Sequence, residues 1–407
     1  MNTKSISLDI VIFGGGVAGL WALNQLRRLG YQAVLLETHT LGGGQTIKSQ
    51  GIIHGGIKYA LSGFLSGSAK AIETMPQRWK DALAGAGELD LRTVNVLSED
   101  QLLWSTGSLG SEIASFFASK ALNSRIQKLP KTAYPSILKN SLFKGHAYRL
   151  EEVVLDTASL IETLAKPHRD YIFKINPNAG YAFTSDPNNP QNVVSLKIFS
   201  DVEAETVEIK AKRYLFTAGE GNGSLGTNLP NAPQMQLRPL QMAMVKLAMP
   251  SPFFAHCVDN GTSPRITITT HPTQDGKTVW YLGGQLAEDG AKRTTTEQIA
   301  CAKKELGALF PWLDLSGSTW ASFFVNRAEP KQPDGKRPEN PFVETLGNIM
   351  TAWPAKLALA PMLSDLILMQ LKQQNIQPSQ TIDETKSLLS HLAKPAIALP
   401  PWEQYFA

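Results

Sequence analysis

The apolar and polar positions of residues 8–37 follow the pattern of a strand, a helix and a second strand. A short apolar run at 10–13 is typical of a buried strand. Apolar residues then recur at roughly helical intervals from Val17 to Leu29, and Gly30 can stop the helix. A second apolar run at 33–36 ends in Glu37. This order predicts the start of an α/β sheet domain.

Three glycines with G-x-G-x-x-G spacing, Gly14, Gly16 and Gly19, lie between the first strand and the helix. Gly14 permits a tight turn, Gly16 lets a pyrophosphate approach the backbone, and Gly19 lets the helix pack close to the strand. The N–H groups and positive dipole end of the helix face the phosphates. Glu37 is placed to accept hydrogen bonds from ribose hydroxyls. The alternative, a glycine-rich turn without a ligand, does not explain this full context.

A second glycine-rich stretch follows at 41–63, and isoleucines interleave with its glycines. This stretch is too apolar for a flexible linker. An ordered backbone lying along a flat ligand explains both the many glycines and the isoleucines better.

The sequence also predicts helices, strands and one turn-to-helix unit further on. The helices are expected at 68–83, with a break or kink at Pro76, at 112–122, after an Asp156 N-cap, and at 296–309. The strands are expected at 193–210, 213–217, 237–247, 266–272 and 279–286. The turn-to-helix unit is expected at 349–371, with Pro361 in the first helical turn.

The composition limits the class of protein. The chain has 407 residues, 43% hydrophobic and 18% charged, which is typical of a globular protein with more than one core. A net charge of +4 with scattered basic residues does not favour nucleic-acid binding, but it fits anionic small molecules. Cys257 and Cys301 have no metal-ligand spacing, so we expect no metal site and a reducing cytoplasm. No apolar run is long enough to span a membrane.

The stretch QTIKSQGIIHGGIKY resembles the flavin-contacting segment of FAD-dependent glycerol-3-phosphate dehydrogenases. L-2-hydroxyglutarate oxidases have a related version, and both belong to the D-amino-acid-oxidase-like superfamily. The resemblance implies that the cofactor is FAD, with Thr46 and Ser49 at its pyrophosphate or ribityl chain. It places His54 and Gly55 along the isoalloxazine. Lys58 stands where those enzymes usually carry arginine, which keeps the positive charge but loses the bidentate fork.

Three later segments extend the resemblance. Ala218-Gly219 resembles the turn that passes near the FAD diphosphate, and Lys356-Leu357 resembles the turn at the flavin edge, although its usual glycines are missing. Arg327, taken to lie just past a strand end at Val325, resembles the arginine that binds the anionic end of the substrate. A surface arginine in a basic loop is the alternative.

The resemblance implies an α/β fold in which a Rossmann-like FAD-binding domain is interleaved with an α+β substrate domain built on an antiparallel sheet. The expected FAD-binding segments are 1–75, 151–230 and 340–375, the substrate segments are 76–150 and 231–339, and 376–407 is a C-terminal extension.

The implied reaction is hydride transfer from a small anionic hydroxy compound to flavin N5. Arg327 would bind the anion, with Lys58, Tyr59 and Lys356 also contacting substrate. His54, His271 or water would accept the hydroxyl proton, although a hydrogen-bonded core role for His54 and a solvated strand-end role for His271 stay open.

Several alternatives remain. An amine or amino-acid oxidase is possible on the same fold, and a nonenzymatic FAD-binding protein is the alternative of another class. NAD binding is disfavoured because the 41–59 segment has no use for a nicotinamide. The electron acceptor is oxygen, a quinone or a carrier protein, and peripheral contact with the inner face of the membrane is compatible with a quinone.

Overall fold

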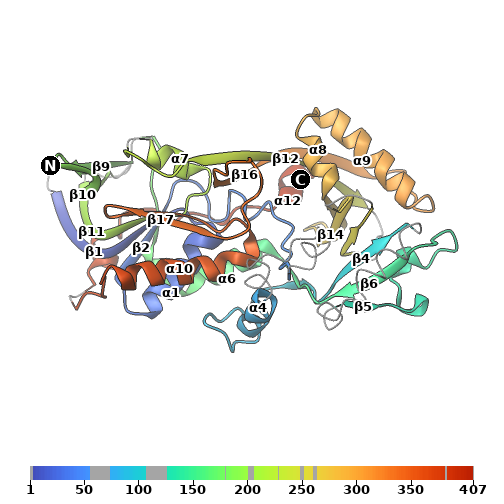
Figure 1. The fold of residues 1–407 in the computed structure, drawn as a ribbon, viewed down its shortest axis with the longest axis horizontal. Coiled ribbons are helices and arrows are strands. Elements are labelled where there is room, and N and C mark those ends of the chain that lie inside the picture. The colour runs from blue at the N-terminus through green and yellow to red at the C-terminus, as the bar shows by residue number, and fades with distance from the viewer. Residues whose placement is uncertain are drawn as a thin grey trace.

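The molecule consists of two lobes, each built on an eight-stranded sheet (Figure 1). The computed structural model describes residues 3–55, 74–106, 126–178, 180–199, 206–227, 229–247, 252–259, 264–380 and 383–406. The first lobe carries the N-terminal strand and helices α1, α6 and α10, and the second lobe carries α8 and α9 (Figure 1). None of the helices in these ranges is long and apolar enough to cross a membrane.

The first sheet has the strand order β17-β18-β11-β1-β2-β8, with β10 and β9 added at β11. Its strands are β1 (Thr3–Phe13), β2 (Ala33–Glu37), β8 (Ile172–Lys174), β9 (Tyr181–Asp186), β10 (Asn189–Phe199), β11 (Thr206–Phe216), β17 (Phe342–Leu346) and β18 (Ile349–Trp353). The pairs β1–β2, β1–β11, β2–β8 and β11–β18 are parallel. Phe13 is in register with both Leu36 and Phe216. The carboxyl ends of three strands therefore meet at one edge, where ligands bind in such sheets.

Helices pack on the first sheet, and the longer ones, α1, α6 and α10, bury apolar side chains in its core. They are α1 (Val17–Arg28), α4 (Met75–Leu83), α6 (Thr157–Ala165), α7 (Gly221–Gly226) and α10 (Ala360–Gln373). The expected N-cap is confirmed, since the Asp156 carboxylate accepts hydrogen bonds from the backbone N–H groups of Ala158 and Ser159. Pro361 lies in the first turn of α10, as expected. Pro76 lies in the first turn of α4, where proline costs no hydrogen bond, and the part of the expected helix at 68–73 lies outside the described residues.

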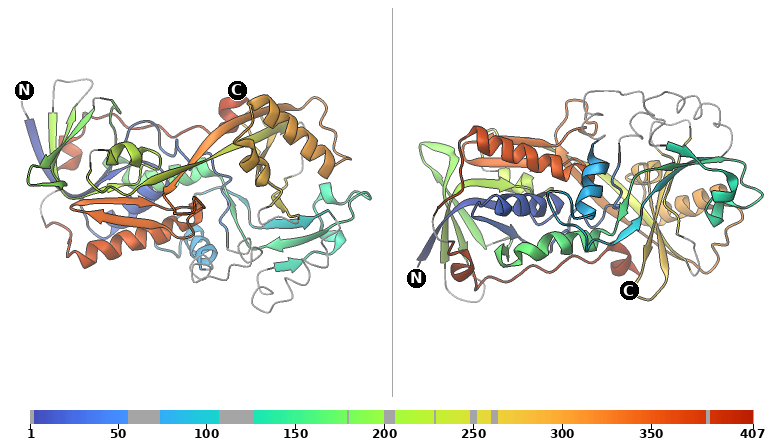
Figure 2. Two further views of the ribbon diagram at one scale, coloured as in Figure 1. Left: turned by 45° about the horizontal axis from the view of Figure 1, so that its top comes forward. Right: turned by 90° about the horizontal axis from the view of Figure 1, so that it is seen from below.

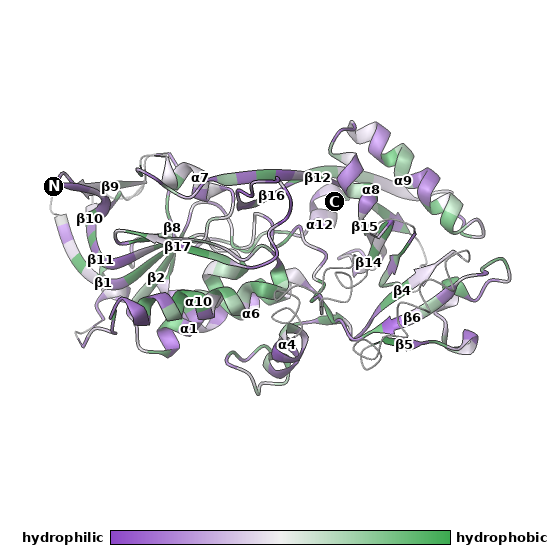
Figure 3. Ribbon diagram, viewed as in Figure 1, coloured by the Kyte–Doolittle hydropathy of each residue, from purple (hydrophilic) through white to green (hydrophobic). Residues whose placement is uncertain are grey.

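The second sheet has the order β16-β12-β15-β14-β13-β4-β6-β5. Its strands are β4 (Gln101–Ser105), β5 (Ile126–Lys128), β6 (His146–Leu150), β12 (Met235–Leu247), β13 (Ala255–Cys257), β14 (Ile266–Pro272), β15 (Thr278–Gly283) and β16 (Thr319–Pro330). Every pair is antiparallel except β4–β13. Helix α9 (Thr295–Leu309), next to α8 (Gln285–Gly290), buries an apolar face in the same core as Trp104 and Trp280. In Figure 3 the sheets are largely green, which marks hydrophobic residues, and the helices carry both green and purple residues, as expected when one face of each helix is buried.

The expected fold class is confirmed: a mostly parallel sheet covered by helices is interleaved with a largely antiparallel sheet. The expected domain bounds stay a prediction. Met75, Trp79 and several apolar residues as far as Val94 pack in the core of the first lobe, and β4 is the first strand of the second sheet along the described chain. The strands β3 (Val96–Ser98) and β7 (Val154–Leu155) form a small two-stranded sheet that is separate from both large sheets. The helix expected at 112–122 lies outside the described residues.

The C-terminal segment runs from the first lobe to the second (Figure 2). Ile397 forms a parallel bridge with Leu41, and the Lys174 N–H donates to the carbonyl of Ala393. After α11 (Thr385–Leu388), the segment ends in α12 (Pro401–Tyr405), where Trp402 is buried in a core with strands of the second sheet. The described residues also form the short 3₁₀ helices η1 (Lys131–Ala133), η2 (Ser136–Leu138), η3 (Lys166–Tyr171) and η4 (Leu357–Leu359). The C-terminal segment therefore contacts both lobes.

Candidate flavin site

The glycine turn after β1 combines two packing positions with one open position. Gly14 has φ +105°, and a Cβ there would meet the Ala218 Cα at 2.5 Å. A Cβ on Gly19 would lie 2.0 Å from the Gly14 carbonyl oxygen. On Gly16 it would meet a single atom within 4 Å, the Thr46 Oγ1 at 3.2 Å. Gly14 and Gly19 are therefore required by the close approach of strands and helix, whereas Gly16 borders open space.

The N-terminus of α1 is suited to a diphosphate. Gly16 gives it no side-chain cap, and its first turn contains no acidic residue. The Thr46 Oγ1 accepts from the Val17 N–H at 3.1 Å, and the Ser49 hydroxyl donates to the Thr46 carbonyl at 2.9 Å. The Glu37 carboxylate accepts from the Gly15 N–H at 2.6 Å. A positive helix end, a hydroxyl and a carboxylate thus converge at the sheet edge, and these groups fit the pyrophosphate and ribose of FAD.

The end of β11 lies beside the same turn. The Thr217 N–H donates to the Phe13 carbonyl at 2.8 Å, so the following Ala218-Gly219 turn is held against Gly14. Gly219 has φ +60°, a conformation that favours glycine. Asn222 links this turn to β18, because its Oδ1 accepts from the Ala218 N–H and its Nδ2 donates to the Ala352 carbonyl. Asn222 belongs to no sequence motif, so this role was not predicted.

The turn before α10 keeps the backbone conformation of a glycine turn without the glycine. Ala355 has φ +60°. The next residue, Lys356, is buried, and its Nζ lies 3.5 Å from the Glu339 carbonyl oxygen. Leu357 begins η4, which leads directly into α10. The turn therefore follows the carboxyl end of β18, which runs parallel to β11, and its contact with the flavin stays a prediction.

His54 is held by a buried carboxylate. The Ile53 N–H donates to the Val153 carbonyl, and Ile52 bridges to Val154, so this segment pairs with the chain before α6. The Glu152 Oε2 lies 3.1 Å from the His54 Nδ1, and its Oε1 accepts from the Gly55 N–H at 2.7 Å. The Glu152 side chain is 1% exposed and that of His54 is 19% exposed. The imidazole is therefore oriented by Glu152 but still accessible.

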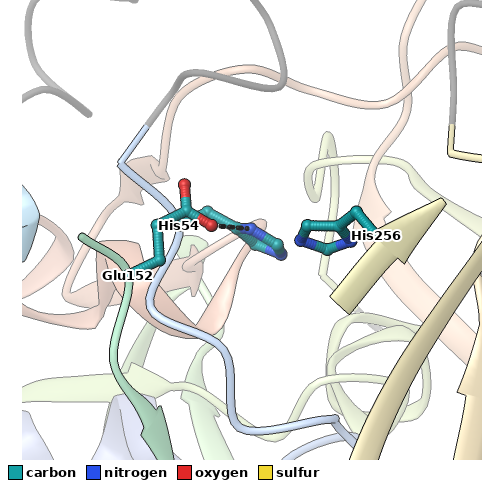
Figure 4. A group of neighbouring side chains, drawn as sticks. All are labelled: His54, Glu152 and His256. Atoms are coloured by element: carbon teal, nitrogen blue, oxygen red, sulfur yellow. Dashed lines mark hydrogen bonds and ion pairs between the residues drawn. The ribbon is translucent and has the colours of Figure 1, made fainter. Parts of the chain in front are cut away.

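A second histidine completes this cluster from the other lobe. His256 on β13 is buried, and its Nδ1 lies 2.8 Å from the Thr267 Oγ1 on β14. The His54 and His256 ring centroids are 5.6 Å apart, with 28° between the planes (Figure 4). One donor atom each of His54, Glu152 and His256 lie within 4.8 Å of one another. Neither Glu152 nor His256 was expected from the sequence, because neither belongs to a motif.

The 41–55 segment is fixed to the second sheet as well. The Gln50 Nε2 donates to the carbonyls of Thr267 and Tyr281, at 3.2 and 2.9 Å. The Tyr281 hydroxyl donates to the Lys48 carbonyl at 2.6 Å. This segment therefore lies between the lobes, as expected for a backbone that follows a flat ligand.

Two other expected site residues, His271 and Arg327, lie within strands of the second sheet. Two more lie outside the described residues. His271 is buried, its Nε2 lies 2.9 Å from the Thr269 Oγ1, and burial lowers its pKa to about 3. This does not favour the hypothesis that His271 is the base. Arg327 does not lie past the end of a strand, as the sequence suggested, but within β16, which continues to Pro330. Lys58 and Tyr59 lie outside the described residues.

Arg327 is a mostly buried cation. Its Nη1 lies 3.2 Å from the Glu288 carboxylate, and its Nε lies 3.3 Å from the Arg238 carbonyl oxygen. Burial lowers the pKa of its guanidinium, and the neighbouring cations Arg238 and Arg337 lower it further. The expectation of a mere surface arginine is therefore not supported.

The glycine turn at the edge of a parallel sheet, together with a glycine-rich segment between two lobes, is the arrangement expected of an FAD-binding protein. The sequence matches the family described as FAD dependent oxidoreductase over residues 9–352, and the chain belongs to this family. It is 46% identical to a probable FAD-dependent oxidoreductase of Pseudomonas aeruginosa, over 99% of this chain and 100% of that protein.

Solved structures agree with this assignment. The crystal structure of the Pseudomonas aeruginosa protein gives a TM-score of 0.83, with 99% of each chain covered. Glycine oxidase of Geobacillus kaustophilus gives 0.63 at 15% identity, covering 92% of this chain and 99% of that one. L-alpha-glycerophosphate oxidase of Mycoplasma pneumoniae with FAD bound gives 0.62 at 16% identity, covering 90% and 95%. The last two show the fold alone.

Proposed function

We propose that this FAD-dependent oxidoreductase oxidises the CH–OH group of a small anionic hydroxy compound. The observation that carries the proposal is the His54–Glu152 pair, at 3.1 Å, at the end of the segment between the lobes. When bound, FAD supplies the hydride acceptor. The chain must then supply a proton acceptor and a site for the anion.

A hydroxyl donor needs a base more than an amine donor does. The O–H proton must leave as the carbonyl forms, whereas an amine can enter the site already neutral. The Glu152 carboxylate accepts a hydrogen bond from the His54 Nδ1–H, which fixes the tautomer and leaves Nε2 able to accept a proton. The buried negative charge of Glu152 also stabilises the imidazolium that results. An oriented imidazole of this kind suits an alcohol.

Arg327 and Lys356 are the cations proposed for the substrate anion. The carboxylate partner of Arg327, Glu288, is 40% exposed, so a substrate anion could replace it at low cost. One short stretch of chain interacts with both cations: Arg337 acts electrostatically on Arg327, and the carbonyl oxygen of Glu339, two residues later, contacts Lys356. Lys58 and Tyr59 are proposed as further substrate contacts from the sequence alone. Oxygen, a quinone or a carrier protein is proposed as the final electron acceptor.

The test is to mix the FAD-loaded protein with candidate donors without oxygen. Reduction is measured as the loss of visible flavin absorbance. The panel contains 2-hydroxy acids, glycerol-3-phosphate and amino acids. We expect at least one hydroxy compound to bleach the flavin, and His54→Asn to slow that reaction about 10²–10⁴-fold, as for loss of a general base. His146→Asn, on β6 in the second sheet, is the matched control. Bleaching by amino acids alone would establish an amine oxidase, and no bleaching by any compound would favour a nonenzymatic role.

A further inference from the structure

We propose that His256 is a positioning residue that shares with His54 the proton taken from the substrate. On this view Glu152, His54, His256 and Thr267 form one proton-sharing row across the boundary between the lobes. The inference rests on the proposed function for the source of the proton. The inference adds His256, from the second lobe, to the His54–Glu152 pair of the first lobe.

Both ends of the row are fixed by backbone pairing. The Gly51–Ile53 stretch pairs with Val153–Leu155, which sets the position of Glu152 against His54. His256 and Thr267 are register partners in the β13–β14 pair, which explains their 2.8 Å contact. Neither contact depends on a flexible loop. The row therefore has the rigidity that proton transfer between fixed atoms requires.

The two rings present nitrogen atoms to each other. In Figure 4 the His54 nitrogen that is not bonded to Glu152 points toward His256, and a His256 nitrogen points back. A proton arriving at this edge of His54 can be shared by both imidazoles. A second proton would place two cations side by side, which their repulsion disfavours. The row is therefore suited to holding one extra proton.

The same geometry argues against a metal ion, although the side chains are typical ligands. Glu152 lies against one nitrogen of His54, and His256 faces the other. The lone-pair directions of these two nitrogens diverge. One ion could not bind Glu152 together with the His54 nitrogen that faces His256 unless the ring turned over and broke the hydrogen bond to Glu152. A proton fits the observed arrangement without such a change.

The proposal predicts coupled titration of two histidines. The chain has seven histidines, few enough for NMR with ¹³C-labelled histidine, and single substitutions assign the signals. Among the described residues, Glu152 from the segment before β7 and the uncharged Thr267 from β14 face the pair, and Leu103 of β4 is the register partner of His256. In the FAD-loaded protein we expect the pair to take up its first proton at a higher pH than a lone histidine, and its second at a lower pH. In His256→Asn, His54 should titrate once, between these two points.

The readouts separate this proposal from the proposed function. His54 titration that is the same in the native protein and in His256→Asn would overturn the pairing, even if a hydroxy compound bleaches the flavin. Coupled titration without any bleaching would leave the pairing standing and overturn the function. Where a donor is found, His256→Asn should slow flavin reduction about tenfold to a hundredfold and leave the donor's KM nearly unchanged, while His146→Asn alters neither. Binding of one Zn²⁺ by the native protein, lost in both His54→Asn and His256→Asn, would overturn the row in favour of an ion site.

Discussion

Trp402 of α12 lies flat on His271 of β14, with ring centroids 3.9 Å apart and 23° between the planes. Both side chains are buried. The C-terminal segment reaches this point after pairing with Leu41 in the first lobe, next to the glycine turn. The stack therefore fixes the second lobe to a segment that also touches the flavin site.

Replacement of Trp402 by alanine should destabilise the protein by about 3–5 kcal/mol, as for other buried tryptophans. Tyr405, on the same helix, stacks on Phe323 but is 51% exposed. Tyr405→Ala is therefore the matched control, with an expected loss of about 1 kcal/mol or less. Chemical denaturation followed by circular dichroism measures both. Equal losses in the two variants would show that the stack on His271 is not the main contact.

His271 should make the stability depend on pH. Its pKa is about 3 in the folded protein, because of burial, against 6.5 in the unfolded chain. Below pH 6.5 the unfolded chain takes up a proton that the folded protein does not, so stability falls as pH decreases toward 3, by at most about 1.4 kcal/mol per pH unit. His271→Phe keeps a ring under Trp402 and should flatten this slope. An unchanged slope would rule out His271 as its source.

The first lobe could be predicted from the sequence because its signals are local. Gly14, Gly16 and Gly19 form a recognisable motif within six residues, and the following helix appears where its apolar period places it. The end of β16 was not predictable, since Arg327 interrupts the apolar pattern while the strand continues along its partner β12 to Pro330.

The cluster of His54, Glu152 and His256 shows more clearly which site residues a sequence cannot predict. His54 was expected to lie at the flavin because it belongs to a motif, but its partners come from segments about 100 and 200 residues away. Glu152 and His256 have ordinary neighbours in the sequence. Only the pairing of 51–55 with the chain before α6, and of β13 with β14, brings them together.

Alanine substitutions in the glycine turn should separate folding from cofactor binding. Gly14→Ala places a Cβ 2.5 Å from the Ala218 backbone at φ +105°, so we expect little folded protein. Gly16→Ala meets only the Thr46 hydroxyl, at 3.2 Å, and should fold but bind FAD at least about tenfold more weakly, since its methyl group lies where the diphosphate approaches the backbone. Thermal unfolding of the FAD-free protein and titration with FAD measure the two effects. Normal FAD affinity in Gly16→Ala would place the diphosphate elsewhere.

Ala355→Gly should stabilise the protein by up to about 1 kcal/mol. Alanine at φ +60° pays roughly 1–2 kcal/mol for a left-handed conformation, and glycine avoids this cost while losing part of the gain to the greater freedom of the unfolded chain. Ala355→Val should destabilise, because a β-branched residue tolerates this conformation least. Chemical denaturation of the three proteins gives the order Gly, Ala, Val. A destabilised glycine variant would mean that the alanine methyl makes a contact worth more than the strain.

Arg327→Ala should raise the KM for the anionic donor about tenfold to a hundredfold, because loss of a charge-assisted hydrogen bond costs about 1.5–3 kcal/mol. Arg327→Lys should recover only part of the affinity, since lysine keeps the charge but not the fork. Arg149, which pairs with Asp100 and is 45% exposed, is the control position. Steady-state kinetics with the donor found by flavin bleaching measures the effect, and unchanged folding is checked by FAD content. If Arg327→Ala and Arg149→Ala behave alike, the anion is bound by other cations, and Lys356 becomes the next residue to replace.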